Sequence, residues 1–448
     1  MQEIEDRKKR IRYLLWTYFI LLMIEGTLRK WFLPFLSTPL LLIRDPIAVM
    51  AIFWGWPMLT KSIHWLRVKI LMYIGAISIV LAIYVGHGDW FTALYGLRIY
   101  WIQIPLIFIF PLVFNKNDVI RICWVILILS IPMVILLAAQ SSTPPSHILN
   151  VGPGGTGSSA FSGAGGKFRP SAAFSFTNSV TTFFTLATGS LMAIIYGMPK
   201  MREEKGKQKS ENIWVKSIKR LTIFLGITAS IIALPVSISR GLMANYAIVL
   251  ICTVVTLLVT RSNIKSLLIG LGIVTIISNL ALNIPIVKEA SMAFALRWEL
   301  AAGVDRESEG DAAVVEHQLK NRVLYSYLEP IEERDKYSLL GRGIGLGSNI
   351  GAVRLSGKKQ FLSSEGSWAK TMDEKGLFLG TAFLLWRIST AMMMVKKAIN
   401  IAFIKKNKIP LILTSISMSM ILNSQLGQSS GLGFVVLTTG LTFASMKE

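Results

Sequence analysis

Apolar runs of roughly 17–25 residues, each long enough to cross a bilayer, alternate with short polar connections along the chain. The pattern predicts about twelve membrane-spanning helices. Their expected ranges are 12–31, 40–59, 68–86, 98–114, 119–138, 172–197, 220–236, 241–260, 264–284, 375–395, 409–423 and 430–445. We therefore expect an all-α polytopic membrane bundle. Residues 1–284 and 375–448 would form the transmembrane helices, and residues 285–374 one large, partly helical loop.

Composition supports the membrane assignment. The 448 residues are 52% hydrophobic and only 16% charged, whereas a soluble domain carries about 25% charged residues. The net charge of +22 would suit a nucleic-acid partner. Because the basic residues fall in short segments between spans, membrane topology explains them and no nucleic acid is expected.

Basic residues mark one side of the predicted bundle. They concentrate in the N-terminus and in the connections 60–67, 115–118, 198–219, 261–263 and 396–408. The positive-inside rule therefore predicts that both termini are cytoplasmic and that the loops 141–170 and 285–374 lie outside. No small-residue cleavage site follows the first apolar run, so we expect an uncleaved first span. Cys123 and Cys252 are expected to be free thiols.

Polar side chains gather at the outer ends of the spans. They are Glu25, Arg29, Arg44, Asp45, Arg98, Thr177, Asn178, Arg240, Asn423, Gln425 and Gln428. Glu25–Arg29 and Arg44–Asp45 favour structural ion pairs, and a single arginine can snorkel to headgroups. The clustering on one face nevertheless indicates a site for an anion, because arginine offers planar donors that match phosphate.

The end of the large loop carries further candidate chemistry. Alternating glycines flank Arg342 in LLGRGIGLGSN (339–349), a pattern typical of a surface turn. Glu365 and Trp368 are three residues apart and would share a face of a short helix, a carboxylate beside an aromatic ring that suits sugar binding. Asp373 and Glu374 favour a plain helix start. The four histidines lie in separate segments, so no metal site and no cofactor are expected.

Taken together, these segments resemble the O-antigen ligase and O-antigen polymerase superfamily. The resemblance rests on SISRGLMANYAIVL (237–250), on the late outer loop with LLGRGIGLGSN, and on EGSWAKTMDEKGLFLG (365–380). IEGTLRKWFLPFLSTPLLLIRDP (24–46) and FRPSAAFSFTNSVTTFF (168–184) are similar to a bacterial exopolysaccharide branch. The ligases usually carry a loop histidine near the position of Glu365. This chain has none there, which favours a polymerase-like or divergent glycosyltransferase over a ligase.

The resemblance implies a GT-C-like, metal-independent glycosyltransferase in the bacterial inner membrane, with its site on the outer face. The donor would be a glycan on undecaprenyl pyrophosphate, and the acceptor a second glycan or lipid-linked chain. Other polysaccharide-assembly proteins would be further partners. Arg240, Arg342, Arg297 and Arg322 would hold the leaving pyrophosphate, with Arg98 and Arg29 in support. Glu365, with Glu309 behind it, would be the general base, and Trp368 would bind substrate.

Two other classes of protein stay open. A transporter of lipid-linked sugars would show broken spans and charges at mid-membrane. A non-catalytic scaffold would tolerate loss of each outer arginine.

Overall fold

The computed structural model describes residues 2–447 apart from 156, 158–160, 198–211, 263–264, 302–324, 358–361 and 363–365. The described part is built almost entirely of helices. In the first half these are α1 (Gln2–Thr27), α2 (Asp45–Leu59), α3 (Trp65–Tyr84), α4 (Trp90–Arg98), α5 (Phe110–Val113), α6 (Lys116–Ser141) and α7 (Thr177–Gly197).

The second half continues with α8 (Ile213–Val236), α9 (Arg240–Val259), α10 (Lys265–Ala281), α11 (Pro285–Ala301), α13 (Tyr325–Glu332), α14 (Asn349–Ser356), α15 (Ser367–Lys405), α16 (Ile409–Asn423) and α17 (Ser429–Ser445). Short π and 3-10 turns are η1 (Leu28–Phe32), η2 (Pro34–Leu36), η3 (Pro39–Leu42), η4 (Ile99–Gln103), η5 (Ile104–Phe108), η6 (Ile148–Asn150) and η8 (Arg334–Lys336). β1 (Phe161–Ser162) and β2 (Phe168–Arg169) form one antiparallel pair.

Nine helices among the described residues are long and apolar enough to cross a membrane. They are Gln2–Phe32, Pro39–Leu59, Trp65–Tyr84, Trp90–Val113, Lys116–Ser141, Thr177–Gly197, Ile213–Val236, Arg240–Val259 and Ser367–Lys405. The chain is therefore a multi-pass, all-α membrane protein. The three remaining predicted spans correspond to α10, which is the first half of the bent pair α10–α11, and to the shorter helices α16 and α17, so the count of twelve stays a prediction.

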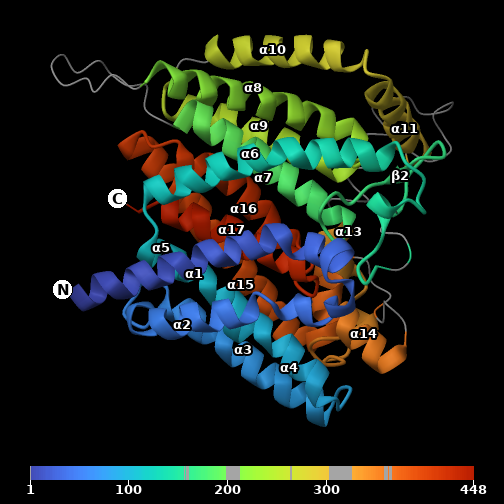
Figure 1. The fold of residues 1–448 in the computed structure, drawn as a ribbon. Helices are drawn as coiled ribbons and strands as arrows, with labels where there is room; N and C mark the ends of the chain where they lie inside the picture. Colours follow the sequence, from blue (N-terminus) through green and yellow to red (C-terminus); the bar gives the residue numbers. More distant parts are fainter. Residues whose placement is uncertain are drawn as a thin grey trace.

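The long helices run side by side across the view of Figure 1, and both termini lie at the same end of the bundle. We call this the terminal end. The opposite end, where α11, α13, α14 and the β-hairpin gather, is called the loop end. At the terminal end, Arg12 bonds to the Val113 carbonyl and lies 3.5 Å from Asp118. Lys447 bonds to the Leu112 carbonyl nearby.

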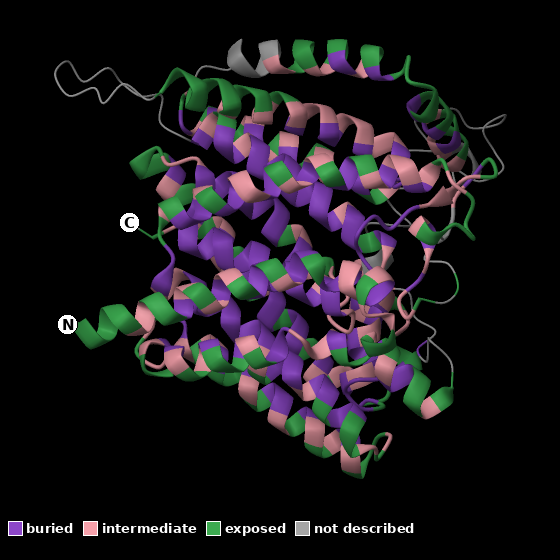
Figure 2. Cartoon of the chain, viewed as in Figure 1, coloured by how far each residue is buried: buried purple, intermediate pink, exposed green. Residues whose placement is uncertain are grey.

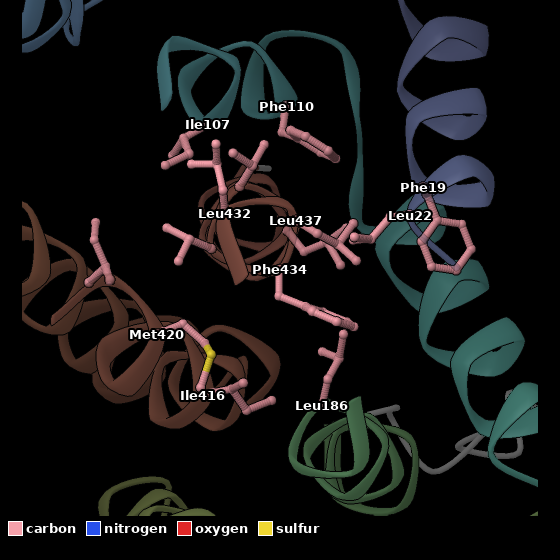
Figure 3. Close-up of a cluster of buried hydrophobic side chains, with 14 of the residues drawn as sticks. Phe19, Leu22, Ile107, Phe110, Leu186, Ile416, Met420, Leu432, Phe434 and Leu437 are labelled. Carbon is pink, nitrogen blue, oxygen red and sulfur yellow. The ribbon is translucent and has the colours of Figure 1, made fainter. Parts of the chain in front are cut away.

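The core surrounds α17, which packs between α1, α5, α7 and α16 (Figure 3). Small residues allow this contact: the Cα of Gly440 lies so close to Phe110 that an added Cβ would come within 2.5 Å of the ring. Across the helix pair α16–α17, the Ser417 hydroxyl bonds to the Thr442 hydroxyl at 2.5 Å. Buried residues fill the middle of the bundle, whereas α8 and α10 carry much exposed surface along the edge (Figure 2).

The fourth span differs from the sequence expectation. The predicted range was 98–114, whereas the candidate span Trp90–Val113 begins earlier, with α4. Asp89 caps it by accepting the Thr92 N–H at 2.9 Å. Arg98, expected at the opening of a span, therefore lies inside one.

Two helix breaks coincide with the expected limits of the large loop at 284 and 374. Pro285 opens α11 after a bend of 105° from α10. Gly376 interrupts α15 with φ 73° and ψ 178°. The backbone departs from the bundle axis at both points, because neither residue continues the preceding helix.

Candidate functional site

The turn between α8 and α9 carries Arg240 as the first residue of α9. Ser239 caps that helix by accepting the Leu242 N–H, and its hydroxyl lies 2.9 Å from that of Thr181 on α7. The preceding residue, Ile238, has a positive φ of 46°. This conformation costs a β-branched residue on the order of 1–3 kcal/mol, so surrounding contacts must hold the turn.

Arg297 of α11 supplies one of these contacts. Its Nη1 donates to the Ile238 carbonyl at 2.5 Å, and its side chain is half-buried. The bend before Pro285 carries α11 to this position. The structure thus brings Arg297 to the turn that bears Arg240, which is half-buried as well.

An apolar cavity of about 550 Å³ reaches the same turn. Its walls come from α7, α8, α9, α10 and α11, and they include Leu191, Leu234, Met243, Leu250, Val274 and Phe294. Met243 is one helical turn after Arg240, and Phe294 is one turn before Arg297. The lining of this partly open apolar cavity therefore comes within one helical turn of both arginines, although neither arginine lines it.

A network of buried charges occupies the loop-end half of the first helices. Arg44 Nε lies 3.0 Å from Glu25 Oε2, and Arg29 Nη1 lies 3.7 Å from Glu25 Oε1. Arg98 Nη1 lies 2.8 Å from Asp45 Oδ2. The predicted Glu25–Arg29 pair is present. The predicted Arg44–Asp45 pair is wrong, because Arg44 pairs with Glu25 and Asp45 pairs with Arg98.

Arg29 and Arg98 therefore use their guanidinium groups inside the protein. Arg29 also donates to the Ser37 carbonyl and to the Ser175 hydroxyl, both at 2.8 Å. Arg98 also donates to the Tyr95 hydroxyl at 2.8 Å. These contacts use donors of both guanidinium groups, although the buried Arg98 Nε has no hydrogen-bond partner among the described residues. Their role toward substrate stays a prediction.

The α15 helix folds back on itself at Gly376. A straight helix would separate Ser367 from Arg387 by about 30 Å at 1.5 Å per residue. Instead, Arg387 Nη1 donates to the Ser367 hydroxyl at 3.2 Å. Gly380 lies close against Met372, and an added Cβ would meet its sulfur at 2.7 Å. Residues 367–375 therefore form a short arm packed beside the long arm 377–405.

Glu374, at the tip of this fold, binds the glycine-rich segment 341–347. Its Oε1 accepts the N–H groups of Gly345 and Gly347 at 3.1 and 2.8 Å, and Oε2 lies 3.2 Å from Lys375 Nζ. Gly345 has φ 95°, and a Cβ there would come within 2.2 Å of the Thr92 carbonyl oxygen. The expectation of a surface turn is wrong, because these glycines let the backbone pack between α4 and α15.

A small polar cavity of about 30 Å³ lies beneath this segment. It has room for about two water molecules. Its polar lining includes Tyr100, Lys370, Glu374, Lys375, Arg387 and Gln425. Arg387, which is fully buried, also donates to the carbonyls of Ile421 and Ser424 at 2.6 and 3.1 Å. Three cationic side chains and one carboxylate thus share one cavity, which leaves an excess of positive charge.

A second attachment joins the glycine-rich segment to the α3–α4 turn. His87 Nδ1 accepts the Asp89 N–H, so Nε2 carries the proton that bonds to the Ile344 carbonyl at 3.1 Å. Arg354 of α14 lies 2.8 Å from Asp89. The bonds to Arg354 and Thr92 hold the pKa of the Asp89 carboxyl well below its ordinary value.

The other predicted site residues are placed as follows. Arg342 has an exposed side chain, and its N–H donates to the Asp373 carbonyl at 2.9 Å. Trp368 lies at the start of α15; its Nε1 donates to the Leu422 carbonyl, and its ring contacts Tyr327 edge to face. Glu365, Arg322 and Glu309 lie outside the described residues. Within the described part, no three His, Cys, Asp or Glu side chains gather as a metal site.

Sequence reasoning missed Lys375 and Arg387 and gave Glu374 only a helix-start role. One signal was present: Arg387 interrupts an otherwise apolar run, FLLWRISTAMM, inside a predicted span. A charge at that depth is costly and usually faces a protein interior or a functional site. The fold of α15 at Gly376, which unites these residues, has no comparable signal in the sequence.

Comparison of the chain with protein-family models, curated protein sequences and solved structures gives no significant match.

Proposed function

We propose that the protein is a membrane glycosyltransferase that polymerises or transfers glycans carried on undecaprenyl pyrophosphate, as members of the O-antigen ligase and polymerase superfamily do. In this proposal it lies in the bacterial inner membrane with its terminal end in the cytoplasm. The loop end then faces outward and carries the active site.

One observation carries the proposal: the lining of an apolar cavity of about 550 Å³ includes Met243 and Phe294, each one helical turn from an arginine, Arg240 and Arg297. A polyprenyl phosphate has the matching shape, with an isoprenoid chain next to an anionic group. Arg240 is also the first residue of α9, where the helix dipole favours negative charge. An arginine at a helix N-terminus near an apolar cavity therefore suits a lipid-linked phosphate better than a soluble anion.

The chemistry follows from this placement. The acceptor hydroxyl oxygen forms a bond to the anomeric carbon of the donor sugar, while the bond from that carbon to the pyrophosphate oxygen breaks. Arg240 and Arg297 stabilise the charge that develops on the departing pyrophosphate. A carboxylate takes the hydroxyl proton, and Glu365 is the candidate by its place in the sequence. By resemblance, the reaction inverts the anomeric carbon and needs no metal.

A polymerase and a ligase differ in the identity of the acceptor. We favour the polymerase, because the segment around Glu365 has no histidine and the family's ligases carry one there. A ligase is the alternative. Both enzymes would place Arg240 and Arg297 on the donor's pyrophosphate.

Complementation of polysaccharide production tests the proposal. Arg240→Lys keeps the charge but loses the planar pair of donors, and we expect a rate loss of about 100-fold. Glu365→Gln should abolish polymer while membrane insertion stays normal. Arg334→Lys is the matched control, because Arg334 is 75% exposed at the same end of the molecule. Short or single-unit glycan should accumulate in the first two variants only.

Long polymer in both Arg240→Lys and Glu365→Gln would contradict the catalytic assignment. A transporter would then be the favoured function, because the 105° bend between α10 and α11 is a broken helix of the kind that transporters use. Reconstituted vesicles separate the two classes. A transferase lengthens glycan on one face of the membrane, whereas a transporter moves a labelled lipid-linked sugar between faces.

A further inference from the structure

The small polar cavity beneath the glycine-rich segment has no role in the proposed reaction. It lies between the two arms of α15, the turn between α16 and α17, η4 and Gly347. Its volume of about 30 Å³ admits about two water molecules. The side chains around it carry three positive charges, on Lys370, Lys375 and Arg387, and one negative charge, on Glu374.

The carboxylate of Glu374 offsets only one of these positive charges. Its Oε1 accepts the N–H groups of Gly345 and Gly347, and its Oε2 lies 3.2 Å from Lys375 Nζ. Arg387 forms no ion pair with a carboxylate in the part of the chain that the structure describes. The charge of Arg387 is therefore unbalanced inside the protein.

Arg387 is also removed from water, since its side chain is only 1% exposed. Its bonds to the Ile421 and Ser424 carbonyls and to the Ser367 hydroxyl all involve neutral groups. They use three of the five guanidinium N–H donors. A buried charge whose partners are all neutral keeps much of its desolvation penalty, which a counter-ion nearby would reduce.

A second cation lies close to Arg387. Lys375 Nζ is 5.2 Å and Arg387 Cζ is 5.8 Å from the centroid of the same Phe383 ring. Because both distances refer to one ring, the two like charges lie near enough to repel each other in a low-dielectric interior. An anion in the cavity that both side chains line would replace this repulsion with two attractions.

The turn between α16 and α17 adds donors of a different kind. Leu426 and Gly427 line the cavity, and their backbone N–H groups bond to no acceptor among the described residues. Consecutive N–H groups of a turn form the concave anion site that is called a nest. These backbone donors are independent of the charged side chains, and they favour the same kind of ligand.

The size of the cavity restricts its occupant. A phosphate or sulfate ion carries four oxygens and needs more room than about two water molecules occupy. A chloride ion is only slightly larger than one water molecule and fits this space. Water fits as well, but it leaves the charge of Arg387 unbalanced.

We propose that this cavity binds one small monovalent anion, which is chloride in ordinary buffers. The anion neutralises Arg387 and joins the two arms of α15 to the turn between α16 and α17. It is a structural component of the loop end and takes no part in a reaction. The inference therefore goes beyond the proposed transferase function and does not depend on it.

Replacement of chloride tests the inference on the full-length protein in detergent. Potassium chloride is exchanged for potassium gluconate at constant ionic strength, because gluconate is too large for the cavity. We expect the midpoint of thermal unfolding to rise with chloride and to reach a plateau. At a hundredfold excess over the dissociation constant the rise should be about 3 °C. Equilibrium dialysis with radioactive chloride should show one saturable site per chain.

Three variants locate the site. Arg387→Met removes the unbalanced charge and should weaken chloride binding at least about tenfold. Arg334→Met is the matched control, because Arg334 is 75% exposed at the same end of the molecule, and its binding should equal that of the unmodified protein. Glu374→Gln removes the negative charge that faces the anion and should tighten binding about fivefold.

A direct observation decides the case in which Arg387→Met does not fold. In crystals of the unmodified protein grown in bromide, the anomalous peak should lie in the cavity beside Arg387 and Lys375. A peak elsewhere, or unchanged chloride binding by Arg387→Met, would overturn the assignment to this cavity. Equal midpoints in chloride and gluconate, without saturable binding, would show that water fills the cavity and would also overturn it. None of these measurements reads glycan synthesis, so failure here leaves the transferase proposal to its own test.

Discussion

The carboxylate of Glu374 accepts hydrogen bonds from backbone N–H groups that are distant in the sequence. It accepts two N–H groups of the glycine-rich segment and also lies beside Lys375. Hydrogen bonds to a charged group contribute more than neutral ones, because the charge strengthens the electrostatic attraction. A buried N–H left without a partner also keeps its full desolvation penalty. This one side chain therefore holds the segment that carries Arg342.

Replacement of Glu374 tests that function. Glu374→Leu removes the oxygen that accepts both N–H groups and should lower the free energy of unfolding by about 2–4 kcal/mol. Glu374→Gln retains an acceptor oxygen and should lose less. Thermal unfolding in detergent measures both, with Asp335→Asn as a control because Asp335 is 96% exposed. Equal stability of the Leu and Gln variants would show that the two N–H bonds contribute nothing.

Gly345 illustrates a requirement that only a structure reveals. Gly345 and Gly357 both have positive φ, but a Cβ at Gly357 would meet nothing within 4 Å. Gly357→Ala should therefore cost only the conformational strain, about 1–2 kcal/mol. Gly345→Ala adds a collision with the Thr92 carbonyl and should be clearly less stable. Limited proteolysis of the loop end checks this, and equal resistance of both variants would contradict the packed segment.

Single residues were predictable where a polar group interrupts an apolar run. Arg240 stands in a short gap between two long apolar segments, so its place at a helix start followed from the pattern. The role of Glu374 did not follow. Its partners Gly345 and Gly347 are 29 and 27 residues away, and only the tertiary fold brings them together.

At the scale of elements, α15 combines a short arm and a long arm that a sequence pattern reads as a loop and a span. The pattern detects the apolar long arm, because its length and composition suit a bilayer. It misses the reversal of chain direction at Gly376, because a positive φ at a glycine does not change the spacing of apolar residues. The cavity that holds Arg387 is a product of that reversal.

The attachment of α14 to the α3–α4 turn has a defined pH dependence. The pKa of Asp89 is lowered by its bond to Arg354, so the pair contributes stability above the ordinary carboxyl value of about 3.9. That stability is lost only as the pH falls through the lowered pKa. The protection factors of the α14 amides, which are corrected for the intrinsic pH dependence of exchange, should therefore stay constant between about pH 8 and about pH 5.

Asp89→Asn removes the charge and should speed exchange in α14 at neutral pH. The exchange rate in α7, which makes no contact with this pair, serves as the internal control. Protection of α14 that falls in the unmodified protein between pH 7 and pH 5 would contradict the assignment, because the carboxylate stays ionised over that range.

At the scale of the whole molecule, both termini lie at one end of the bundle and α14 lies at the other (Figure 1). The class of fold was predictable, because apolar length dominates the energetics of a membrane helix. The number of spans was harder. The pair α10–α11 bends by 105°, and α16 and α17 are short, so length alone does not assign them.

Cysteine labelling tests the orientation. In a chain with Cys123→Ala and Cys252→Ala, an impermeant maleimide should label the Arg334→Cys variant in intact cells. The Lys61→Cys variant should react only after the cells are opened. Both positions are exposed, so reactivity reports the side of the membrane. The reverse result would invert the topology and place the candidate site in the cytoplasm.

The short helices α16 and α17 are tolerated because protein surrounds them. Their 15 and 17 residues span about 22 and 26 Å, whereas the hydrocarbon core is about 30 Å thick. Most residues of α16 and almost all of α17 are buried inside the bundle. Helices that contact neighbouring helices in place of lipid do not have to match the thickness of the bilayer, so the polar turn between them lies within the protein without deforming the membrane.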